Sequence, residues 1–258
     1  MRNIKGICFF LVLAFCSFQY IQTKPVLYII GDSTVKNGSG TGADKLWGWG
    51  SFLSGYFDTT RIEVQNHAIG GRSSRTFITE GRWDKILNTL KQGDFVIIQF
   101  GHNDSSPLDD TARARGTIKG INDDSTEIYN PIRKMKETVH SYGWYMRKFI
   151  NDTKAKGATA IVCSPVPRNN FVNGKVQRGT TDYGLWAKQV AAQTGAAYIE
   201  LNGMIADRYD SLGAETVSKF FPVDHTHPNE EGSRLNADMV VKGIRDLDKT
   251  KLRDFLKH

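Results

Sequence analysis

The sequence predicts a single α/β domain in which a central, mostly parallel sheet of five strands lies between two layers of helices. Apolar segments of strand length alternate along the chain with segments of helical length, which is typical of a doubly wound three-layer α/β/α sandwich. Several apolar segments are nearly continuous in Ile, Val and Phe, as expected for strands buried on both faces. The length of 258 residues and the hydrophobic content of 40% fit one domain with a full-sized core.

The apolar segments place the five expected strands at residues 26–30, 62–69, 94–100, 159–165 and 196–201. Helices are expected at residues 77–90, 138–156, 183–194 and 229–246. Glycine lies just beyond each of the first three helices, as Gly93, Gly157 and Gly195, and glycine is a common helix stop. Asn229 is suited to cap the last helix at its N-terminus.

A mostly polar stretch covers residues 107–136, between the third expected strand and the next long helix. A loop of this length inside a compact domain is usually functional. The alternative is an excursion of the chain into solvent.

The N-terminus predicts a secretory signal over residues 1–23, followed by the domain at residues 24–258. Arg2 and Lys5 precede an apolar run at residues 7–18 that is too short to span a bilayer. We therefore expect a secreted or periplasmic protein. Two alternatives are lipid attachment at Cys16, which follows Leu-Ala-Phe, and an uncleaved membrane anchor.

Removal of the expected signal leaves a basic chain with a single cysteine. The net charge is +7, and the chain stays basic after loss of Arg2 and Lys5. Cys8 and Cys16 lie in the expected signal, which leaves Cys163 without an internal disulfide partner. Cys163 lies in an apolar strand segment, and we interpret it as an inert core thiol.

Polar clusters follow three of the expected strands directly, at residues 31–34, 70–73 and 101–104. In an open α/β sheet, ligands bind outside the carboxyl ends of the strands. The three clusters should therefore meet at one edge of the sheet.

The first cluster and a segment near the C-terminus carry residues suited to nucleophilic catalysis. Ser33 ends the first strand at an expected strand-to-helix turn, where backbone N–H groups point at a developing negative charge. A serine needs a base, and the base needs an orienting partner. Asp224 and His227 are three residues apart, so one tight turn can bring them together as the rest of a catalytic triad.

The other two clusters offer donors for an oxyanion. Gly71 has no side chain and can present its backbone N–H at close range. Asn103 can present a side-chain amide from the third strand. With the N–H of Ser33, these two groups form the expected oxyanion hole.

Ser33, Gly71, Asn103 and His227, in this chain order, resemble the four sequence blocks of the SGNH (GDSL-like) hydrolases. The first block here is Gly-Asp-Ser-Thr, with Thr34 where the name of the superfamily has Leu. Residues 101–104 and 224–227, together with 115–117 and 142–145, are similar to rhamnogalacturonan acetylesterases. The resemblance implies a flavodoxin-like sandwich and a serine esterase that removes acetyl groups from the rhamnogalacturonan backbone of pectin. It implies that neither a metal nor another cofactor is used.

The expected partner is an acetylated acidic polysaccharide or oligosaccharide, with no nucleic acid and no stable membrane insertion after signal removal. We expect the protein to be a monomer. Candidate substrate-binding residues are Arg72, Arg75, Arg115, His102 and His225. Together with Arg113 and Lys119, these arginines could line a cationic groove for the acidic backbone. The alternative is that these charges form a solvated face.

Several other functions stay open at this point. An α/β-hydrolase is disfavoured because Val35 breaks the Gly-x-Ser-x-Gly motif. A dinuclear metallophosphoesterase could use Asp32, Asn103 and the His225-x-His227 pair, but the early Asp-x-His motif of such sites does not occur. An acetylesterase for another glycan such as xylan, a simple-ester hydrolase and an inactive carbohydrate-binding protein are the remaining alternatives.

Overall fold

The computed structural model describes residues 24–38, 40–42, 44–248 and 250–257. The expected signal at residues 1–23, with Cys8 and Cys16, lies outside the described residues. Within the described chain, none of the helices has the length and apolar character needed to cross a membrane.

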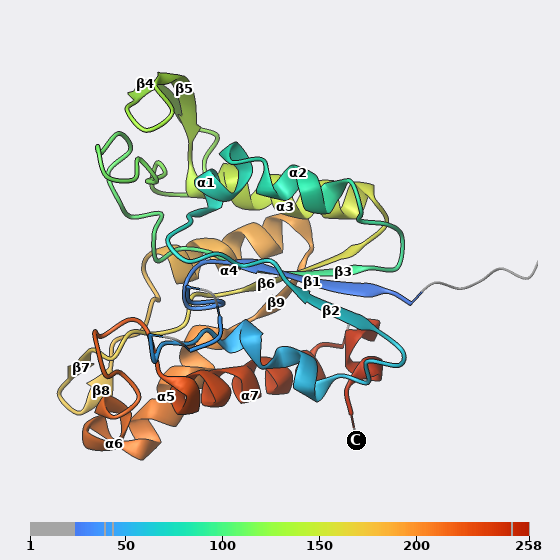
Figure 1. Cartoon of the computed structure of the whole chain (residues 1–258), viewed down its shortest axis with the longest axis vertical. Coiled ribbons are helices and arrows are strands. Elements are labelled where there is room, and N and C mark those ends of the chain that lie inside the picture. The colour runs from blue at the N-terminus through green and yellow to red at the C-terminus, as the bar shows by residue number, and fades with distance from the viewer. Residues whose placement is uncertain (1–23, 39, 43, 249, 258) are drawn as a thin grey trace, which may run out of the picture.

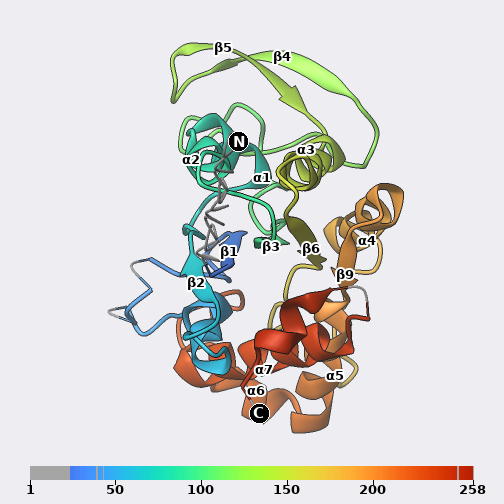
Figure 2. The same ribbon diagram turned by 90° about the vertical axis from the view of Figure 1, so that its right-hand side faces the viewer.

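Five parallel strands form the central sheet in the order β2-β1-β3-β6-β9, which confirms the predicted fold class (Figures 1 and 2). Their bounds are Val26–Gly31 (β1), Glu63–Asn66 (β2), Phe95–Gln99 (β3), Thr159–Cys163 (β6) and Ala197–Ile199 (β9). All five expected strand segments therefore contain a strand of this sheet. The carboxyl ends of these strands lie together at the left edge of the molecule in Figure 1.

Each face of the sheet is covered by helices, as Figure 2 shows. In β1, Leu27 and Ile29 belong to one core cluster, whereas Tyr28 and Ile30 belong to the other. This alternation follows from the two-residue repeat of a strand. The second cluster includes residues of Ser74–Thr79 (α1), Arg82–Leu87 (α2), Tyr142–Ala155 (α3) and Tyr183–Thr194 (α4). The first cluster includes residues of Leu201–Leu212 (α5), Ala214–Ser218 (α6) and Glu230–Asp246 (α7). Short 3₁₀ helices lie at Trp49–Ser51, Leu53–Tyr56 and Lys251–Phe255.

Cys163 is a free, fully buried thiol in the core cluster that contains Leu27 and Ile29. Burial raises its pKa to about 12, so the thiolate is absent at neutral pH. The interpretation of Cys163 as a core residue is therefore confirmed.

Two helix predictions need correction. The expected helix at 77–90 is two short helices, because Gly81 adopts a left-handed conformation (φ 68°) between α1 and α2. The expected helix at 138–156 begins later, after Ser141, whose side chain accepts a hydrogen bond from Trp144 N as an N-cap (3.1 Å). The residues before Ser141 belong to a strand instead. The other two helices lie where the sequence places them, and Asn229 caps α7 by accepting from Gly232 N (3.0 Å).

Two β-hairpins project at the edge where the sheet strands end (Figure 1). The first pairs Ser125–Asn130 (β4) with Met135–His140 (β5), so the stretch expected as a loop at 107–136 is partly ordered as a strand. The second pairs Phe171–Val172 (β7) with Lys175–Val176 (β8). The site lies between these hairpins.

Candidate active site

Ser33 lies two residues beyond the end of β1 in a single tight turn. The backbone N–H groups of Val35 and Lys36 both donate to Asp32 O (3.2 and 3.0 Å), and no longer helix follows. The expected strand-to-helix turn is thus one helical turn only. Gly31 is required at the entry, because a Cβ there would lie 2.7 Å from Gln99 O. Ser33 itself is nearly buried, with 7% of its surface exposed.

The side chain of Thr34 holds the turn at residues 32–36, which we call the nucleophile turn, through further hydrogen bonds. Its hydroxyl donates to Asp32 Oδ1 (2.8 Å) and accepts from Gln99 Nε2 (2.7 Å), and Gln99 Oε1 accepts from Trp49 Nε1 (2.9 Å). All four residues are fully buried. The departure from Leu at position 34 therefore brings in a hydroxyl that this buried network uses.

The structure brings Ser33, His227 and Asp224 together although Ser33 and His227 are 194 residues apart. Ser33 Oγ lies 2.8 Å from His227 Nε2, and His227 Nδ1 lies 2.7 Å from Asp224 Oδ2. Both ring nitrogens of His227 are thus engaged within one chain of hydrogen bonds, in the order that a nucleophile, a base and an orienting carboxylate require.

Asp224 is held as a carboxylate by its local turn. Burial on its own would raise its pKa, but hydrogen bonds from the His227 side chain and from the backbone N–H groups of His227 and Thr226 outweigh burial and lower the pKa. Those two N–H groups donate to Asp224 Oδ1 at 2.7 Å each, which leaves Oδ2 for the imidazole. The three-residue spacing therefore aligns the carboxylate as well as bringing it close.

The expected oxyanion donors lie beside Ser33. Asn103 Nδ2 donates one hydrogen to Arg72 O (2.8 Å), which fixes the amide and leaves its second hydrogen for another acceptor. In the part of the chain that the structure describes, no hydrogen bond engages the backbone N–H of Ser33 or of Gly71. Gly71 has a left-handed φ of 78°, a conformation that strains residues with a side chain and favours glycine. These three donors can stabilise a developing oxyanion.

Ser33 and His227 line a cleft of about 660 Å³, which we call the catalytic cleft. The cleft is lined by the nucleophile turn, the segment after β2, the segment at 112–115 and the turn of the first hairpin. Its lining residues include Asn37, Gly71, Arg72, Thr76, Glu80, Asn103, Arg113, Arg115 and Ile132. Three arginines and one glutamate therefore give this cleft a cationic wall.

Arg72 and Arg115 lie where a substrate could reach them. Arg72 lines the cleft and pairs with Glu80 (3.1 Å). Arg115 lines it too, donating from Nη1 to Gly71 O (3.1 Å) and from Nε to Ser106 Oγ (2.9 Å). Arg115 therefore also supports the Gly71 segment.

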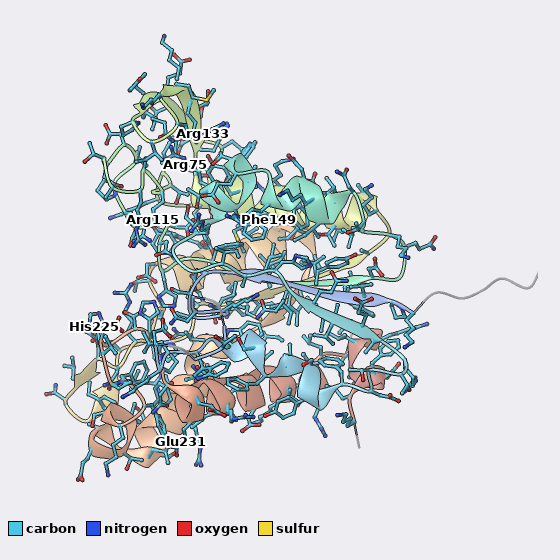
Figure 3. All side chains as sticks on the ribbon, in the orientation of Figure 1. Arg75, Arg115, Arg133, Phe149, His225 and Glu231 are labelled. Carbon is cyan, nitrogen blue, oxygen red and sulfur yellow. The ribbon has the colours of Figure 1, made fainter. Side chains whose placement is uncertain are left out.

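Arg75 does not lie in the cleft. Its side chain is fully buried on α1 and donates to Glu137 and to two backbone carbonyls, so it has no surface for a substrate. Figure 3 shows Arg75 close to α1, with Arg115 nearer the catalytic edge. The expectation that Arg75 touches substrate is corrected by this burial.

Of the two remaining histidines, His102 lies in a second cleft of about 430 Å³, and His225 contacts Arg168, which lines the same cleft. His102 lines it, with Arg168, Asn170, Gln177 and Asp182. Burial lowers the pKa of His102, which favours the neutral ring. His225 is exposed near the catalytic edge, where its Nε2 lies 3.4 Å from Arg168 Nη1 (Figure 3).

Sequence reasoning missed residues that hold the site rather than form it. Gln99 and Trp49 support the nucleophile turn, and Glu137 holds Arg75. Gln99 could have been recognised from the sequence, since it is the one polar residue in the β3 sequence Phe-Val-Ile-Ile-Gln. Glu137 gave none, because its hairpin was not expected.

Among the described residues, no three side chains of His, Cys, Asp or Glu are grouped so that they could hold a metal ion.

Residues 29–235 match the model of the GDSL-like lipase/acylhydrolase family. A rhamnogalacturonan acetylesterase of Emericella nidulans is 34% identical over 219 residues, which cover 84% of this chain and 84% of that protein. A probable rhamnogalacturonan acetylesterase of Bacillus subtilis, YesY, is 32% identical over 227 residues, which cover 86% of this chain and 93% of that protein.

Solved structures share the fold. The Bacillus subtilis protein YxiM matches with a TM-score of 0.69 and 27% identity over 86% of this chain, and this chain spans 56% of that one. The acetylxylan esterase Axe2 of Geobacillus stearothermophilus matches with a TM-score of 0.57 over 89% of this chain and 97% of that one. At 18% identity, the second match is one of fold alone.

Proposed function

The chain belongs to the GDSL-like lipase/acylhydrolase family and is an ester hydrolase, and on this premise we propose that it removes acetyl groups from the rhamnogalacturonan backbone of pectin. The observation that carries the chemistry is the continuous hydrogen-bond chain from Ser33 through His227 to Asp224. The substrate is supported by two relatives above 30% identity that bear the name rhamnogalacturonan acetylesterase. Both relatives align over most of the chain.

The reaction proceeds as acyl transfer in two steps. His227 Nε2 takes the proton of Ser33 Oγ as this oxygen attacks the ester carbonyl, and Asp224 stabilises the imidazolium that forms. The sugar hydroxyl leaves with the proton from His227, which yields an acetyl-enzyme. Water, activated by His227, then attacks this ester and releases acetate and free Ser33.

The negative charge of each tetrahedral intermediate is held by three donors. These are the N–H groups of Ser33 and Gly71 and the second amide hydrogen of Asn103. Because Arg72 O already fixes the Asn103 amide, this donor needs no reorganisation as charge develops.

The cleft charge supports an acidic polysaccharide as substrate. Each repeat of rhamnogalacturonan carries one galacturonate, so a long chain presents regularly spaced carboxylates. Arg113 and Arg115 lie on the wall of the catalytic cleft, where the carboxylate of Glu80 pairs with Arg72 (3.1 Å) and also with Arg82 (2.6 Å). A wall of one sign of charge concentrates an oppositely charged substrate. The basic net charge of the chain fits an acidic substrate, and the signal expected at residues 1–23 fits export to where such a polymer is found.

Acetate release from acetylated rhamnogalacturonan, acetylated xylan and a neutral aryl acetate, assayed side by side, tests this function. We expect kcat/KM to be highest on rhamnogalacturonan. A higher kcat/KM on xylan would show that acetylated xylan is the preferred substrate and would leave the proposed mechanism of ester hydrolysis unchanged. Failure to release acetate from all three would refute the proposed function.

A further inference from the structure

The first hairpin, residues 125–140, which we call the arm, projects beyond the layered domain (Figure 1). Its turn contributes to the lining of the catalytic cleft. Ile132 lies in its turn, is 49% exposed and lines the same cleft as Ser33. We propose that the arm is a polysaccharide-binding specificity element and that Arg75 is the positioning residue that holds it against the cleft. This inference deepens the proposed function and rests on it.

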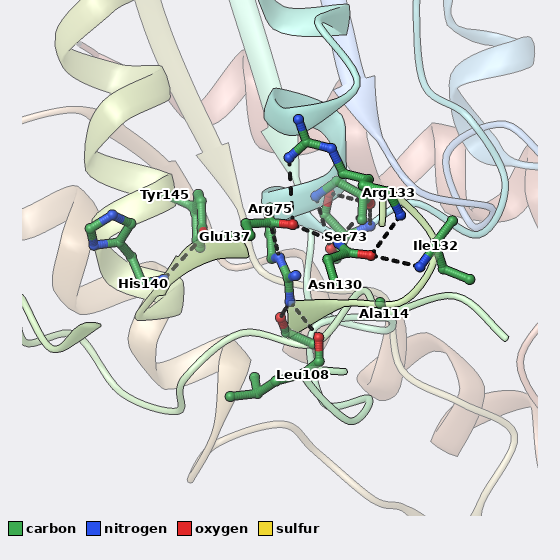
Figure 4. A network of polar contacts seen from close by, with 12 residues as sticks. Ser73, Arg75, Leu108, Ala114, Asn130, Ile132, Arg133, Glu137, His140 and Tyr145 are labelled. Carbon is green, nitrogen blue, oxygen red and sulfur yellow. Dashed lines mark hydrogen bonds and ion pairs between the residues drawn. The ribbon is translucent and has the colours of Figure 1, made fainter. Parts of the chain in front are cut away.

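Arg75 is connected to the turn of the arm by a relay of buried hydrogen bonds, shown in Figure 4. Arg75 Nε donates to Glu137 Oε1 (2.7 Å), and Glu137 Oε2 accepts from Asn130 Nδ2 (2.6 Å). Asn130 Oδ1 then accepts from the backbone N–H groups of Ile132 (2.9 Å) and Arg133 (3.0 Å). The position of Ile132 is thus set from α1, through side chains that are at least nine-tenths buried.

Arg75 also fixes the segment that carries the cationic wall. Its Nη1 donates to Leu108 O (2.8 Å) and to Gly116 O (2.9 Å), which lie at the two ends of that segment. Arg113 and Arg115 lie between these carbonyls and line the cleft. One guanidinium therefore holds both parts of the outer cleft wall.

Stability alone does not account for this arrangement. A buried ion pair loses so much hydration that replacing it with apolar side chains often costs nothing. Arg75 is fully buried and its Nη2 has no hydrogen-bond partner among the described residues, so its desolvation is incompletely offset. A planar donor that reaches one carboxylate and two carbonyls at once is suited to setting a geometry.

The surface of the arm fits a sugar chain. The exposed large apolar side chains of the described residues are Tyr129, Ile132, Met135, Val172 and Val223, and the first three lie on the arm. Met135 pairs directly with Asn130, so Tyr129, the neighbour of Asn130 in β4, projects from the opposite face of the arm. Of the three, Ile132 lines the cleft, where it offers an apolar contact to a sugar ring. Arg133 lies beside Ile132 and pairs with Glu137 (3.5 Å), and Lys134, also exposed in this turn, adds a positive charge to the turn of the arm. An acetylated, uronate-containing polysaccharide matches both features and the adjoining cleft.

The first test replaces Ile132 with aspartate and uses Val172→Asp as the matched control. Val172 is as exposed (52%) and lies on the other hairpin, outside the lining of both clefts. For each variant, the ratio of kcat/KM on the acetylated polysaccharide to kcat/KM on a neutral aryl acetate is measured. We expect Ile132→Asp to lower this ratio about tenfold, through a lost apolar contact and repulsion of uronates. Val172→Asp should keep the wild-type ratio. Equal ratios for the two variants would overturn the proposal.

The second test concerns Arg75 and uses Arg75→Lys and Glu137→Gln, after circular dichroism has shown which of them folds. Lysine keeps the charge but cannot reach all three acceptors. We expect KM on the polysaccharide to rise several-fold while kcat on it changes little, and the ratio to the aryl acetate to fall. If one variant does not fold, the other decides. Equal losses on both substrates would mean that Arg75 supports the catalytic site in general and not the binding of the polysaccharide, which would overturn the proposal.

Failure of this inference can be told apart from failure of the proposed function. If the wild type prefers acetylated xylan, the proposed substrate is wrong, and the arm is tested on xylan with the same variants. If the wild type turns over aryl acetate and no polysaccharide, the arm has no such ligand and the inference fails.

Discussion

The catalytic side chains are each held by a neighbour that leaves one reactive atom available. Asp224 uses Oδ1 for its own turn and presents Oδ2 to His227. Asn103 uses one amide hydrogen on Arg72 O and keeps the other. Such restraint lowers the reorganisation needed when charge develops in the transition state.

Asn103→Ala tests the oxyanion hole. Because the hydrogen bond from Asn103 strengthens mainly in the transition state, kcat for acetate release should fall by roughly 10²–10³. KM should change little, as measured by steady-state kinetics on an aryl acetate. A large rise in KM with unchanged kcat would instead make Asn103 a substrate-binding residue.

Asp104, next to Asn103, predicts a pH dependence of stability. Burial raises the pKa of this carboxyl from 3.8 to about 7, although hydrogen bonds from Ser74 act against the rise. The folded state therefore binds the proton more tightly than the unfolded chain. The stability from Asp104 is then present below about pH 4 and lost as the pH rises through the folded pKa.

The comparison with Asp104→Asn isolates this effect. Between pH 4 and 8, the free energy of unfolding of the wild type should fall by a few kcal/mol relative to that of the variant. Urea unfolding at several pH values measures it. Parallel pH profiles of wild type and variant would show that Asp104 keeps an ordinary pKa.

At the scale of elements, the sequence predicted the sheet because burial on both faces leaves continuous apolar runs. The arm escaped prediction because β4 and β5 are largely exposed and mostly polar, so they lack such a run. The helix expected at 138–156 began too early for the same reason. Gly81 marked the break between α1 and α2, but a lone glycine is often tolerated inside a helix.

The site was predictable where neighbours in sequence act together, and less so elsewhere. Asp224 and His227 share one turn, so their spacing was informative. Arg75 follows the Gly71 segment and was expected to face substrate. Its burial depends on Glu137, which lies 62 residues away on an element that the sequence pattern did not reveal.

Asn229→Ala tests how far a helix end supports the catalytic loop. Asn229 caps α7 two residues after His227, and its Nδ2 also donates to Lys219 O (3.0 Å). Loss of the cap should lower the free energy of unfolding by about 1 kcal/mol. Urea denaturation measures it, with Asn229→Ser as the control that keeps the cap. Equal stability of the alanine and serine variants would contradict this role.

At the scale of the whole molecule, the catalytic cleft and its charged wall predict a salt effect that depends on the substrate. Added salt shortens the screening length from about 10 Å at 0.1 M to about 3 Å at 1 M. The kcat/KM on acetylated rhamnogalacturonan should therefore fall markedly, because attraction by Arg113 and Arg115 is screened. The kcat/KM on a neutral aryl acetate should barely change. Equal salt responses would assign these arginines to a solvated face without a role in recognition.

The fold brings the ends of β1 and β3 and the segment before α7 to one edge of the sheet, so that Ser33, Asn103 and His227 form one active site. The most direct test of Ser33 as the nucleophile is to measure acetate release from acetylated rhamnogalacturonan by the Ser33→Ala variant and by the wild type. We expect the variant to keep the wild-type circular dichroism and melting temperature while kcat falls by roughly 10⁴ or more, since triad members act as a unit. A folded Ser33→Ala protein that retains a tenth of the wild-type kcat would contradict the assignment of Ser33 as nucleophile.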